Sequence, residues 1–345
     1  FVMRGKEYLC AIRPQGEKLV LSTMLYADEI RAAEEIPELE GIEEIDITDK
    51  ELTMAGQLIE SLDAEFDPAE FHDTHREKVL ELIERKDYAR LAEYDALLIR
   101  ETTSVDNHTY RFAKKAESEG LVVMDDPASI LRCTNKVYLT DLLNSHQLGM
   151  PATEILYKER PEDFERVGER LGFPLVLKIP DGCFSRGVIK VESQEALLKA
   201  TAELFEHSVL LLAQEFFYTE YDWRIGVLNR KPIFACQYFM SKGHWQIYNH
   251  KAKGQDINGE CRTLAVHEAP RAVVELAVKT ANLIGDGLYG VDLKQSGDKV
   301  VVIEVNDNPN LDAGIEDAYL QDDLYALVLE EFVRRLELKR QGQVW

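Results

Sequence analysis

The stretch GVDLKQSGDKVVVIEVN, residues 290–306, decides the fold class of this chain. Residues 290–294 and 300–305 are rich in the aliphatic side chains typical of buried strands. Between them, residues 295–298 (Gln-Ser-Gly-Asp) have the composition of a turn. Two strands joined by so short a connection must run antiparallel. We therefore expect a β-hairpin here and not two strands of a parallel sheet.

The same hairpin carries three oxygen-bearing side chains, Asp292, Glu304 and Asn306. Strand pairing places Asp292 beside Glu304, and the two-residue period of a strand puts Glu304 and Asn306 on one face. Carboxylates among apolar residues must be paired or bind a metal, because burying an isolated charge is costly. Magnesium prefers such oxygen ligands together with phosphate oxygens. We predict a magnesium site, and a plain acidic hairpin is the alternative.

The rest of the chain favours the same fold class. Residues 229–232 (Asn-Arg-Lys-Pro) are a second hairpin signal, between strands expected at 224–229 and 232–239. Residues 95–124 are expected to form one β-α-β unit. Helices are expected from apolar periodicity at 136–145, 194–205, 272–284 and 320–339. Helices mixed with hairpins predict an α+β fold and not a doubly wound parallel sheet.

A single lysine, Lys178, ends an otherwise apolar strand. An ammonium group in that position is costly unless it meets an anion. The loop that follows is bracketed by Gly182 and Gly187 and contains Ser185 and Arg186. Backbone N–H groups of such a loop can cover phosphates. The loop is not a Walker motif, because no Gly-Lys-Ser/Thr follows, and an ordinary hairpin is the alternative.

The apolar strand at 211–217 runs into Gln214, Glu215 and Phe216. Its backbone N–H and C=O groups can hold a flat base, with aromatic side chains around it. A plain core strand is the alternative interpretation.

Two further segments carry charge. Asp222 and Arg224 share one face of the next expected strand. Residues 244–254, which include Asn249 and Lys251, are polar, aromatic and basic in an otherwise acidic chain. Their local charge can hold an anionic intermediate, and a solvated loop is the alternative.

The composition excludes some partners. The chain has 345 residues, with 40 basic against 63 acidic side chains and a formal net charge of -23. A protein this acidic repels the phosphate backbone of nucleic acid unless one face is locally basic. We expect no nucleic-acid partner, and an anionic small molecule would need a cationic pocket. The length predicts two or three domains.

The cysteines and the hydropathy bear on the compartment. The five cysteines are scattered without a Cys-x-x-Cys pair, which favours neither a disulfide framework nor a zinc site. No apolar run reaches the roughly 20 residues that span a bilayer, and residues 1–5 lack a signal-peptide pattern. We expect reduced thiols, no membrane partner and a cytoplasmic location. The start at Phe1, in a strand-like alternation, favours a fragment of a longer chain.

Taken in order, these motifs resemble the ATP-grasp superfamily over about residues 94–335, and most closely its RimK-type glutamate ligases. The specificity lies in the ordered set, since each motif alone is common. The set comprises Lys136 before a helix, the strand 173–178, the Gly-bracketed loop, Gln214-Glu215-Phe216, Asp222-Trp223-Arg224, Asp292, Glu304 and Asn306.

The resemblance implies a role for each motif. The implied nucleotide-binding residues are Lys136 and Lys178 at the phosphates, Gly182, Ser185, Arg186 and Gly187 in the covering loop, Gln214, Glu215 and Phe216 at the adenine, and Asp222 at the ribose. The implied metal ligands are Asp292, Glu304 and Asn306. The implied catalytic residues, facing the transferred phosphate or the substrate carboxylate, are Arg224, Asn249 and Lys251.

The resemblance also implies a fold, cofactors and a reaction. ATP lies between two α+β subdomains with Mg²⁺, or Mn²⁺ in its place. A substrate carboxylate attacks the γ-phosphate and yields an acylphosphate and ADP, and an amine then displaces phosphate to form an amide. Magnesium and lysines neutralise the charge of the first step. The implied activity is that of an ADP-forming acid–amino acid ligase acting on a small carboxylate and an amine.

The expected domains are 1–86, 87–130 and 131–340, the last divided into subdomains at 131–218 and 219–340. The middle domain contains only the final β-α-β unit of the fuller domain that usually precedes an ATP-grasp module. Such a partial unit leaves a sheet edge that must be covered. The N-terminal segment or a second copy of the chain can cover it, and in the second case we expect a homo-oligomer.

Residues 1–86 resemble the later part of the bacterial Ku core, the DNA-end-binding protein of end joining. We expect a hairpin of strands at 7–12 and 18–23, then helices near 48–62 and 72–85. The segment has 10 basic and 22 acidic side chains, a net charge of -12 that disfavours duplex binding. We therefore expect a non-catalytic appendage. The residues that carry the match are 5–14, 24–31, 51–59, 67–68 and 76–84.

Three functions stay open at this point. A ligase with a non-catalytic appendage is the leading hypothesis. A Ku-like DNA end-binding protein fused to a nucleotide-binding domain would show salt-sensitive duplex binding. An inactive ATP-binding chimera would bind nucleotide without substrate-dependent release of ADP. The join near residues 86–88 is explained equally by a gene fusion, an engineered chimera or a sequence-assembly artefact.

Overall fold

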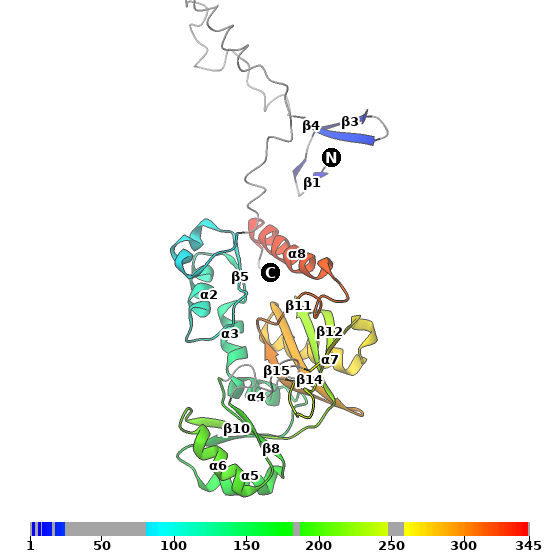
Figure 1. The fold of residues 1–345 in the computed structure, drawn as a ribbon. Coiled ribbons are helices and arrows are strands. Elements are labelled where there is room, and N and C mark those ends of the chain that lie inside the picture. Colours follow the sequence, from blue (N-terminus) through cyan, green and yellow to red (C-terminus); the bar gives the residue numbers. More distant parts are fainter. Residues whose placement is uncertain are drawn as a thin grey trace, which may run out of the picture. The chain divides into compact units, whose positions relative to one another are not determined.

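The computed structural model describes most of the chain after residue 80 and short segments before residue 25. The described residues are 2–3, 6–7, 9–15, 18–24, 81–181, 187–247 and 259–343. The chain divides into two compact units, Phe1–Glu81 and Leu82–Trp345, and each is described by itself (Figure 1). None of the helices in the described part has the length and apolar character needed to cross a membrane.

The described residues of the first unit form two antiparallel strand pairs. β1 (Val2–Met3) pairs with β2 (Lys6–Glu7), and β3 (Leu9–Gln15) pairs with β4 (Lys18–Met24). The hairpin expected here is confirmed, although its first strand continues through Pro14 instead of ending at residue 12. The expected helices near 48–62 and 72–85 fall outside the described residues up to residue 80. Residues 81–84 are described and are not helical.

The second unit begins with a small β-α-β layer. A 3-10 helix, η6 (Arg85–Glu93), leads into β5 (Ala96–Leu98), α2 (His108–Ser118) and β6 (Val122–Met124). The strands β5 and β6 pair in parallel, which confirms the unit expected from the sequence. Because the strands are parallel, the loop after β5 and the N-terminus of α2 lie at one edge of this layer.

A helix that the sequence analysis left unassigned follows β6. In α3 (Pro127–Thr134), the Asp126 carboxylate accepts hydrogen bonds from the backbone N–H of Ala128 and Ser129, at 2.9 and 3.0 Å. Proline at the first helical position lacks only a donor that the helix does not need. This cap and proline place the helix start at Pro127, where the sequence had indicated only the end of a strand.

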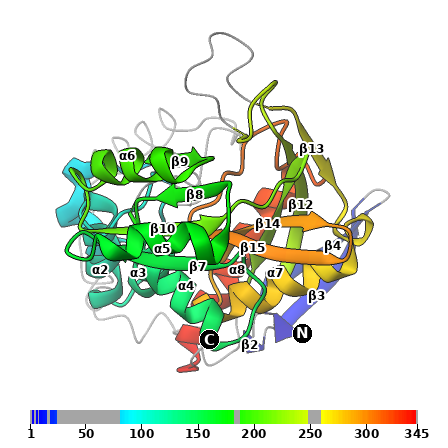
Figure 2. The same ribbon diagram turned by 90° about the horizontal axis from the view of Figure 1, so that it is seen from below.

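An antiparallel sheet of four strands and two helices forms what we call the first lobe. Its strand order is β7-β10-β8-β9, and α5 and α6 cover one face of it (Figures 1 and 2). Leu175, Leu177 and Leu211 are fully buried under these helices. Alternate residues of the same strands, Lys178 and Gln214 among them, point to the opposite face. The elements are β7 (Thr153–Tyr157), α5 (Glu162–Leu171), β8 (Leu175–Lys178), β9 (Val188–Val191), α6 (Gln194–Leu204) and β10 (Leu210–Glu215).

A five-stranded antiparallel sheet forms the second lobe, in the order β13-β12-β11-β14-β15. α4 and α7 bury Leu139, Leu143 and Val273 against one face of it. α8 packs Val328 and Phe332 against the β-α-β layer and the second lobe. The elements are α4 (Lys136–Ser145), β11 (Tyr221–Leu228), β12 (Lys231–Phe239), β13 (Cys261–Leu264), η8 (Val266–Glu268), α7 (Arg271–Ile284), β14 (Leu288–Ser296), β15 (Lys299–Asn306) and α8 (Asp322–Arg340).

Tight hairpins connect the long strands of this sheet, and the α+β class is confirmed. Leu228 pairs with Lys231, so Asn229 and Arg230 form a two-residue turn, both with positive φ. Such a turn matches the twist of the two strands that it joins. The β14–β15 connection is also shorter than expected, because Ser296 pairs with Lys299.

An irregularity in the β14–β15 ladder sets which side chains meet. Asp292 pairs with Glu304, but the next pair is Leu293 with Val302, so Ile303 is an extra residue. A bulge of this kind reverses the facing of the residues beyond it. As a result Val302 and Val305 both enter the core while Glu304 stays on the opposite face.

Candidate functional site

The polar face of the first lobe is built on β8 and β10. Lys178 Nζ donates a hydrogen bond to Gln214 Oε1 at 2.7 Å, and Gln214 Nε2 donates to Thr153 Oγ1 at 2.8 Å. Gln214 is only 5% exposed, so its amide oxygen is shielded from water and orients the ammonium group of Lys178. The ammonium group is thus presented on the face opposite α5 and α6.

The second lobe carries a row of charged side chains across three adjacent strands. Arg224, Asp292 and Glu304 lie in register on β11, β14 and β15. Arg224 Nε and Nη2 donate to the two oxygens of Asp292 at 2.7 and 2.8 Å. Asn306 Nδ2 donates to Asp292 Oδ2 at 3.1 Å. The three residues predicted to bind a metal, Asp292, Glu304 and Asn306, are therefore side by side. The guanidinium of Arg224 is bonded to Asp292.

Helix α4 adds a second lysine to this row. Lys136, its first residue, places Nζ 3.0 Å from Glu304 Oε1. Its backbone N–H donates to Pro180 O at 3.3 Å, just after β8. Lys136 therefore connects the end of the first-lobe strand that carries Lys178 with the charged row of the second lobe.

A third lysine, Lys294, was not singled out from the sequence. Its Nζ lies 2.5 Å from Asp222 Oδ1 and 2.8 Å from Thr219 Oγ1, and Thr219 Oγ1 also donates to Asp222 at 3.0 Å. Both side chains of the ion pair are largely buried, at 13% and 14% exposure. The sequence does contain a signal for Lys294. It lies two residues after Asp292, and so on the same polar face of β14.

The pKa values of this cluster reflect crowding of charges in a buried place. Burial lowers the pKa of Lys178 to about 8; Glu304 opposes the shift, and Lys136 and Lys294 add to it. Burial would raise the pKa of Glu304, but Lys136, Lys178 and Arg224 together lower it below its ordinary value. Burial raises the pKa of Asp222, and Lys294 partly offsets this. Three lysines converge here, so an added anion would be stabilised.

The shifted pKa of Lys178 predicts a pH-dependent stability. An unfolded lysine titrates near 10.5 and the folded one near 8, so below pH 8 both states hold the proton and the buried charge costs stability. As pH rises from 8 to 10.5, only the folded state releases the proton, and this cost disappears. We expect Lys178→Met to be more stable than the wild type at pH 7, by at most about 3 kcal/mol, and the difference to vanish near pH 10.5.

Thermal unfolding of both proteins across this pH range, without nucleotide, measures the difference. Lys199→Met, which alters an exposed lysine on α6, is the control and should follow the wild type at every pH. A stability difference between Lys178→Met and wild type that stays constant with pH would contradict the prediction.

The segment expected to hold the adenine lies at the end of β10. The Glu215 N–H donates to Ala152 O at 2.8 Å, and the Phe216 N–H donates to Pro174 O at 3.3 Å. The Phe216 ring contacts Trp245 edge-on, with centroids 5.7 Å apart, and Lys190 Nζ lies 4.8 Å from its centroid. Aromatic side chains, Phe216 and Trp245, therefore lie beside the backbone of residues 215–216 at the end of β10.

Some predicted site residues cannot be placed. Gly182, Ser185 and Arg186 of the covering loop and Asn249 and Lys251 of the basic segment lie outside the described residues. Gly187, at the far end of the loop, is described. It has φ of +68°, and its carbonyl oxygen accepts the Ile179 N–H at 3.1 Å. This hydrogen bond closes the base of the loop beside β8.

The donor set fits magnesium. Asp292 and Glu304 offer carboxylates from opposite positions on adjacent strands, and Asn306 offers an amide oxygen. One or two carboxylates, completed by phosphate oxygens and water, are the usual magnesium ligands. Within the described part of the chain no three His, Cys, Asp or Glu side chains gather in a metal-binding group. That finding is compatible with this set, whose third member is an amide.

Three further charged residues border the site. Arg100 follows β5 and donates to Asn308 Oδ1 and Pro309 O, at 2.5 and 3.0 Å. Asp125 and Asp307 are 3% and 4% exposed. Burial raises the pKa of Asp307 to about 6, and burial followed by the charge of Asp307 raises that of Asp125. The sequence offered only a weak signal for them, which is polar residues directly after strand ends.

Two family models match the chain. A RimK-like ATP-grasp domain matches residues 133–323, and a Ku70/Ku80 beta-barrel domain matches residues 1–54. The first match contains the three lysines, Asp222, Arg224, Asp292, Glu304 and Asn306, whereas Arg100 and Asp125 precede it. The second match lies in the N-terminal unit.

Curated relatives share about a quarter of their residues with this chain. A probable alpha-L-glutamate ligase of Vibrio vulnificus (strain YJ016) is 27% identical over 248 residues, which are 71% of this chain and 78% of the relative. A probable alpha-L-glutamate ligase 2 of Shewanella sp. (strain MR-4) is 27% identical over 253 residues, 72% of this chain and 80% of the relative.

Solved structures show the same fold. The D-alanine–D-alanine ligase from Bacillus anthracis, in complex with ATP, has a TM-score of 0.59 at 18% identity and covers 75% of this chain and 86% of its own. A RimK domain ATP-grasp protein from Sphaerobacter thermophilus has a TM-score of 0.50 at 20% identity and covers 67% and 81%. At these identities the likeness concerns the fold alone.

Proposed function

The chain belongs to the RimK-like ATP-grasp family, and from that premise we propose that it is an ADP-forming ligase that joins a carboxylic acid to an amine. The observation that carries the proposal is the convergence of Lys136, Lys178 and Lys294 on the carboxylates of Glu304 and Asp222. Assembling buried charges costs folding free energy, so such a cluster is poorly explained by a role in stability. Neutralising the charge of a nucleoside triphosphate explains it better.

The lysines bind and orient the phosphates in this proposal. Lys178 is held by Gln214 and Lys136 by Glu304, so both ammonium groups are positioned before ATP arrives. Preorganised cations lower the energy of the charge that develops during phosphoryl transfer. Gly187 closes the base of the loop that would cover the phosphates, with Gly182, Ser185 and Arg186 within that loop.

The base of ATP is assigned to the end of β10 and the ribose to the start of β11. Gln214, Glu215 and Phe216 would line the adenine, and the wall formed by Phe216 and Trp245 supports a flat ring. Asp222 would accept a hydrogen bond from a ribose hydroxyl, with Lys294 paired to its carboxylate.

Magnesium would be held by Asp292, Glu304 and Asn306 and would neutralise phosphate charge. Arg224, held by both oxygens of Asp292, is placed to stabilise a phosphoryl oxygen or a substrate carboxylate. Asn249 and Lys251 are proposed for the same role, contact with the transferred phosphate or the substrate carboxylate.

The reaction then has two balanced steps. A carboxylate oxygen of the acid bonds to the γ-phosphorus as the bond to the β-phosphate oxygen breaks, which leaves an acylphosphate and ADP. The amine nitrogen bonds to the acyl carbon, phosphate leaves, and the amine loses a proton. The proposed acid–amino acid type follows the relatives described as alpha-L-glutamate ligases.

We propose that the N-terminal Ku-like segment is not catalytic, since the residues assigned here all lie in the second unit. Its net charge of -12 disfavours duplex DNA as a partner. The scattered cysteines, without a Cys-x-x-Cys pair, support a proposed cytoplasmic location.

Thermal unfolding of the full chain with ATP and magnesium tests the proposal. Ligand at a hundredfold excess over Kd stabilises the native state by about 2.7 kcal/mol. We expect a rise in Tm that needs both ATP and magnesium, followed by ADP release that depends on an acid and an amine. A folded sample with no magnesium-dependent rise would overturn the proposal, and ADP release independent of both substrates would favour an inactive ATP-binding chimera.

A further inference from the structure

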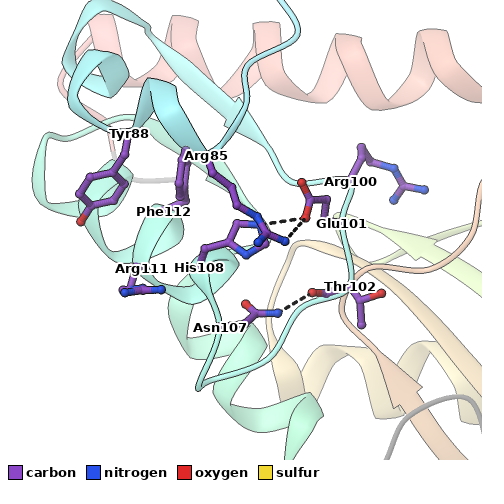
Figure 3. A pocket seen from close by; sticks show the side chains of 9 residues that line it. All are labelled: Arg85, Tyr88, Arg100, Glu101, Thr102, Asn107, His108, Arg111 and Phe112. Carbon is purple, nitrogen blue, oxygen red and sulfur yellow. Dashed lines mark hydrogen bonds and ion pairs between the residues drawn. The ribbon is translucent and has the colours of Figure 1, made fainter.

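A large pocket lies on the β-α-β layer. It has a volume of about 990 Å³ and is lined by the loop after β5, the first turn and a half of α2, and η6 (Figure 3). None of the residues assigned to ATP or magnesium lines it. Pockets of this size hold drug-sized ligands, so the space is larger than one amino acid needs.

The lining of the pocket is cationic in a strongly acidic chain. It contains Arg85, Arg100 and Arg111 but one carboxylate, Glu101. Glu101 Oε2 lies 2.8 Å from His108 Nε2 and 3.7 Å from Arg85 Nη2. Figure 3 shows Arg111 pointing away from that group, without a drawn partner. The lining thus contains three guanidinium groups and one carboxylate in a chain of net charge -23, although Arg100 also interacts with Asp125, Asp312 and Glu316 outside the lining.

Helix α2 adds to the positive potential. Its 11 residues begin at the pocket, and its first turn contains no acidic side chain. Asn107 accepts the Thr109 N–H at 2.8 Å and donates from Nδ2 to Thr102 O at 2.9 Å, which fixes the loop against the helix start. The partial positive charge of a helix N-terminus favours an anion at this position.

One wall of the pocket is aromatic. Tyr88 and Phe112 meet edge to face with centroids 5.1 Å apart, and the His108 ring stands at 90° to Phe112. An aromatic wall beside guanidinium groups suits a ligand with a carbon body and anionic substituents.

Hydrogen bonds connect the lining of the pocket to the loop that follows the proposed magnesium ligands. Arg100 donates to Asn308 and Pro309, and Asn308 Nδ2 donates back to Glu101 O. Asn308 lies two residues beyond Asn306, a proposed magnesium ligand. The pocket and the proposed ligase site are therefore neighbours that meet at Arg100 and Asn308, so one acid of sufficient length is proposed to reach both.

We propose that this pocket binds the distal part of the acid substrate, and that this acid carries at least one further anionic group, a carboxylate or a phosphate. The proposal rests on the proposed ligase function, which supplies the reacting carboxylate. Arg111, which points away from Glu101, pairs with the further anionic group, and Tyr88 and Phe112 pack against the carbon body. A simple monocarboxylic acid offers no second anion to Arg111 and is the poorer substrate.

Calorimetric titration of the full chain without ATP tests the pocket directly. The probes are triaspartate, the tripeptide Ser-phosphoSer-Ser and neutral triasparagine. We expect an anionic probe to bind at least about tenfold more tightly than triasparagine, and added salt to weaken it. Tighter binding of triaspartate assigns the further group as a carboxylate, and tighter binding of the phosphopeptide assigns it as a phosphate.

Three variants locate the binding. Arg111→Gln should weaken the anionic probe about fivefold, as expected for one exposed charge pair. Arg166→Gln, a matched exposed arginine on α5, should leave it unchanged. Glu101→Gln removes the one acid of the lining and should tighten binding, a direction that a folding defect cannot produce.

Equal binding of triasparagine and the anionic probes, or an anionic probe unaffected by both Arg111→Gln and Glu101→Gln, would overturn the proposal. Failure of the ligase function is a separate result. In that case ATP and magnesium leave the Tm unchanged while the anionic probe still binds and still responds to Arg111→Gln.

Discussion

Replacement of Glu304 by glutamine is expected to reduce ADP release by at least about 100-fold, the range seen when one stabilising group is removed from a transition state. Glutamine keeps the size of the side chain but removes the charge that faces Lys136 at 3.0 Å and pairs in register with Asp292. The proposed magnesium ligand is lost, and Lys136 and Lys178 are left without their shared counter-charge.

The same variant should lose the stabilisation by ATP and magnesium. At a hundredfold excess over the wild-type Kd, the gain of about 2.7 kcal/mol should fall close to zero. Thermal unfolding with and without the nucleotide measures this. Glu206→Gln, an exposed glutamate just beyond α6, is the control and should keep the full gain. If Glu304→Gln kept the gain in Tm, ATP and magnesium would bind elsewhere.

Replacement of Arg224 by leucine is expected to lower both stability and activity. Arg224 and Asp292 are 16% and 17% exposed and share two hydrogen bonds. Removing one partner of such a pair leaves a buried charge, at a cost of about 3 kcal/mol. The free energy of unfolding should fall by that amount, and ADP release by about 100-fold. Arg262→Leu, an exposed arginine on β13 of the same sheet, should change neither.

A double variant separates the two effects of Arg224. Arg224→Leu combined with Asp292→Asn removes the orphaned charge, so most of the lost stability should return. Activity should stay low, because a proposed metal ligand and the guanidinium are both gone. Denaturant unfolding and ADP release measure the two properties separately. Restored activity in the double variant would show that Arg224 serves only to neutralise Asp292.

The long elements could be predicted from the sequence because their signals are local. Helix α4 spans Lys136–Ser145 as expected, and α7 and α8 begin within two residues of their expected starts. Apolar periodicity over ten or more residues identifies such helices. The short elements α3 and β13 gave too few periods and were left unassigned. The ten residues of α5 were also left unassigned, and they contain only three large apolar side chains.

Candidate site residues were predicted to different extents. Lys178, Asp292 and Glu304 stood out, because a charge among apolar strand residues needs a partner. Lys294 and Arg100 did not, because their partners lie far along the chain. Arg100 and Asn308 are separated by 208 positions. The pocket around Arg111 also escaped notice, since its lining comes from three elements that meet only in the folded layer.

The sequence by itself determined that a hairpin within residues 290–306 carries two carboxylates and an amide, and that the fold mixes hairpins with helices. The sequence also predicted that Asp292 lies beside Glu304, but only the tertiary structure decided the register that brings them together and paired them with Arg224 and Lys136. A four-residue turn with a regular ladder would have placed Asp292 away from Glu304, but a two-residue turn and the extra residue Ile303 bring them into register. Turn length and bulge position depend on how β14 and β15 pack against α7 and β11. That packing involves residues from the whole domain, so no local pattern specifies it.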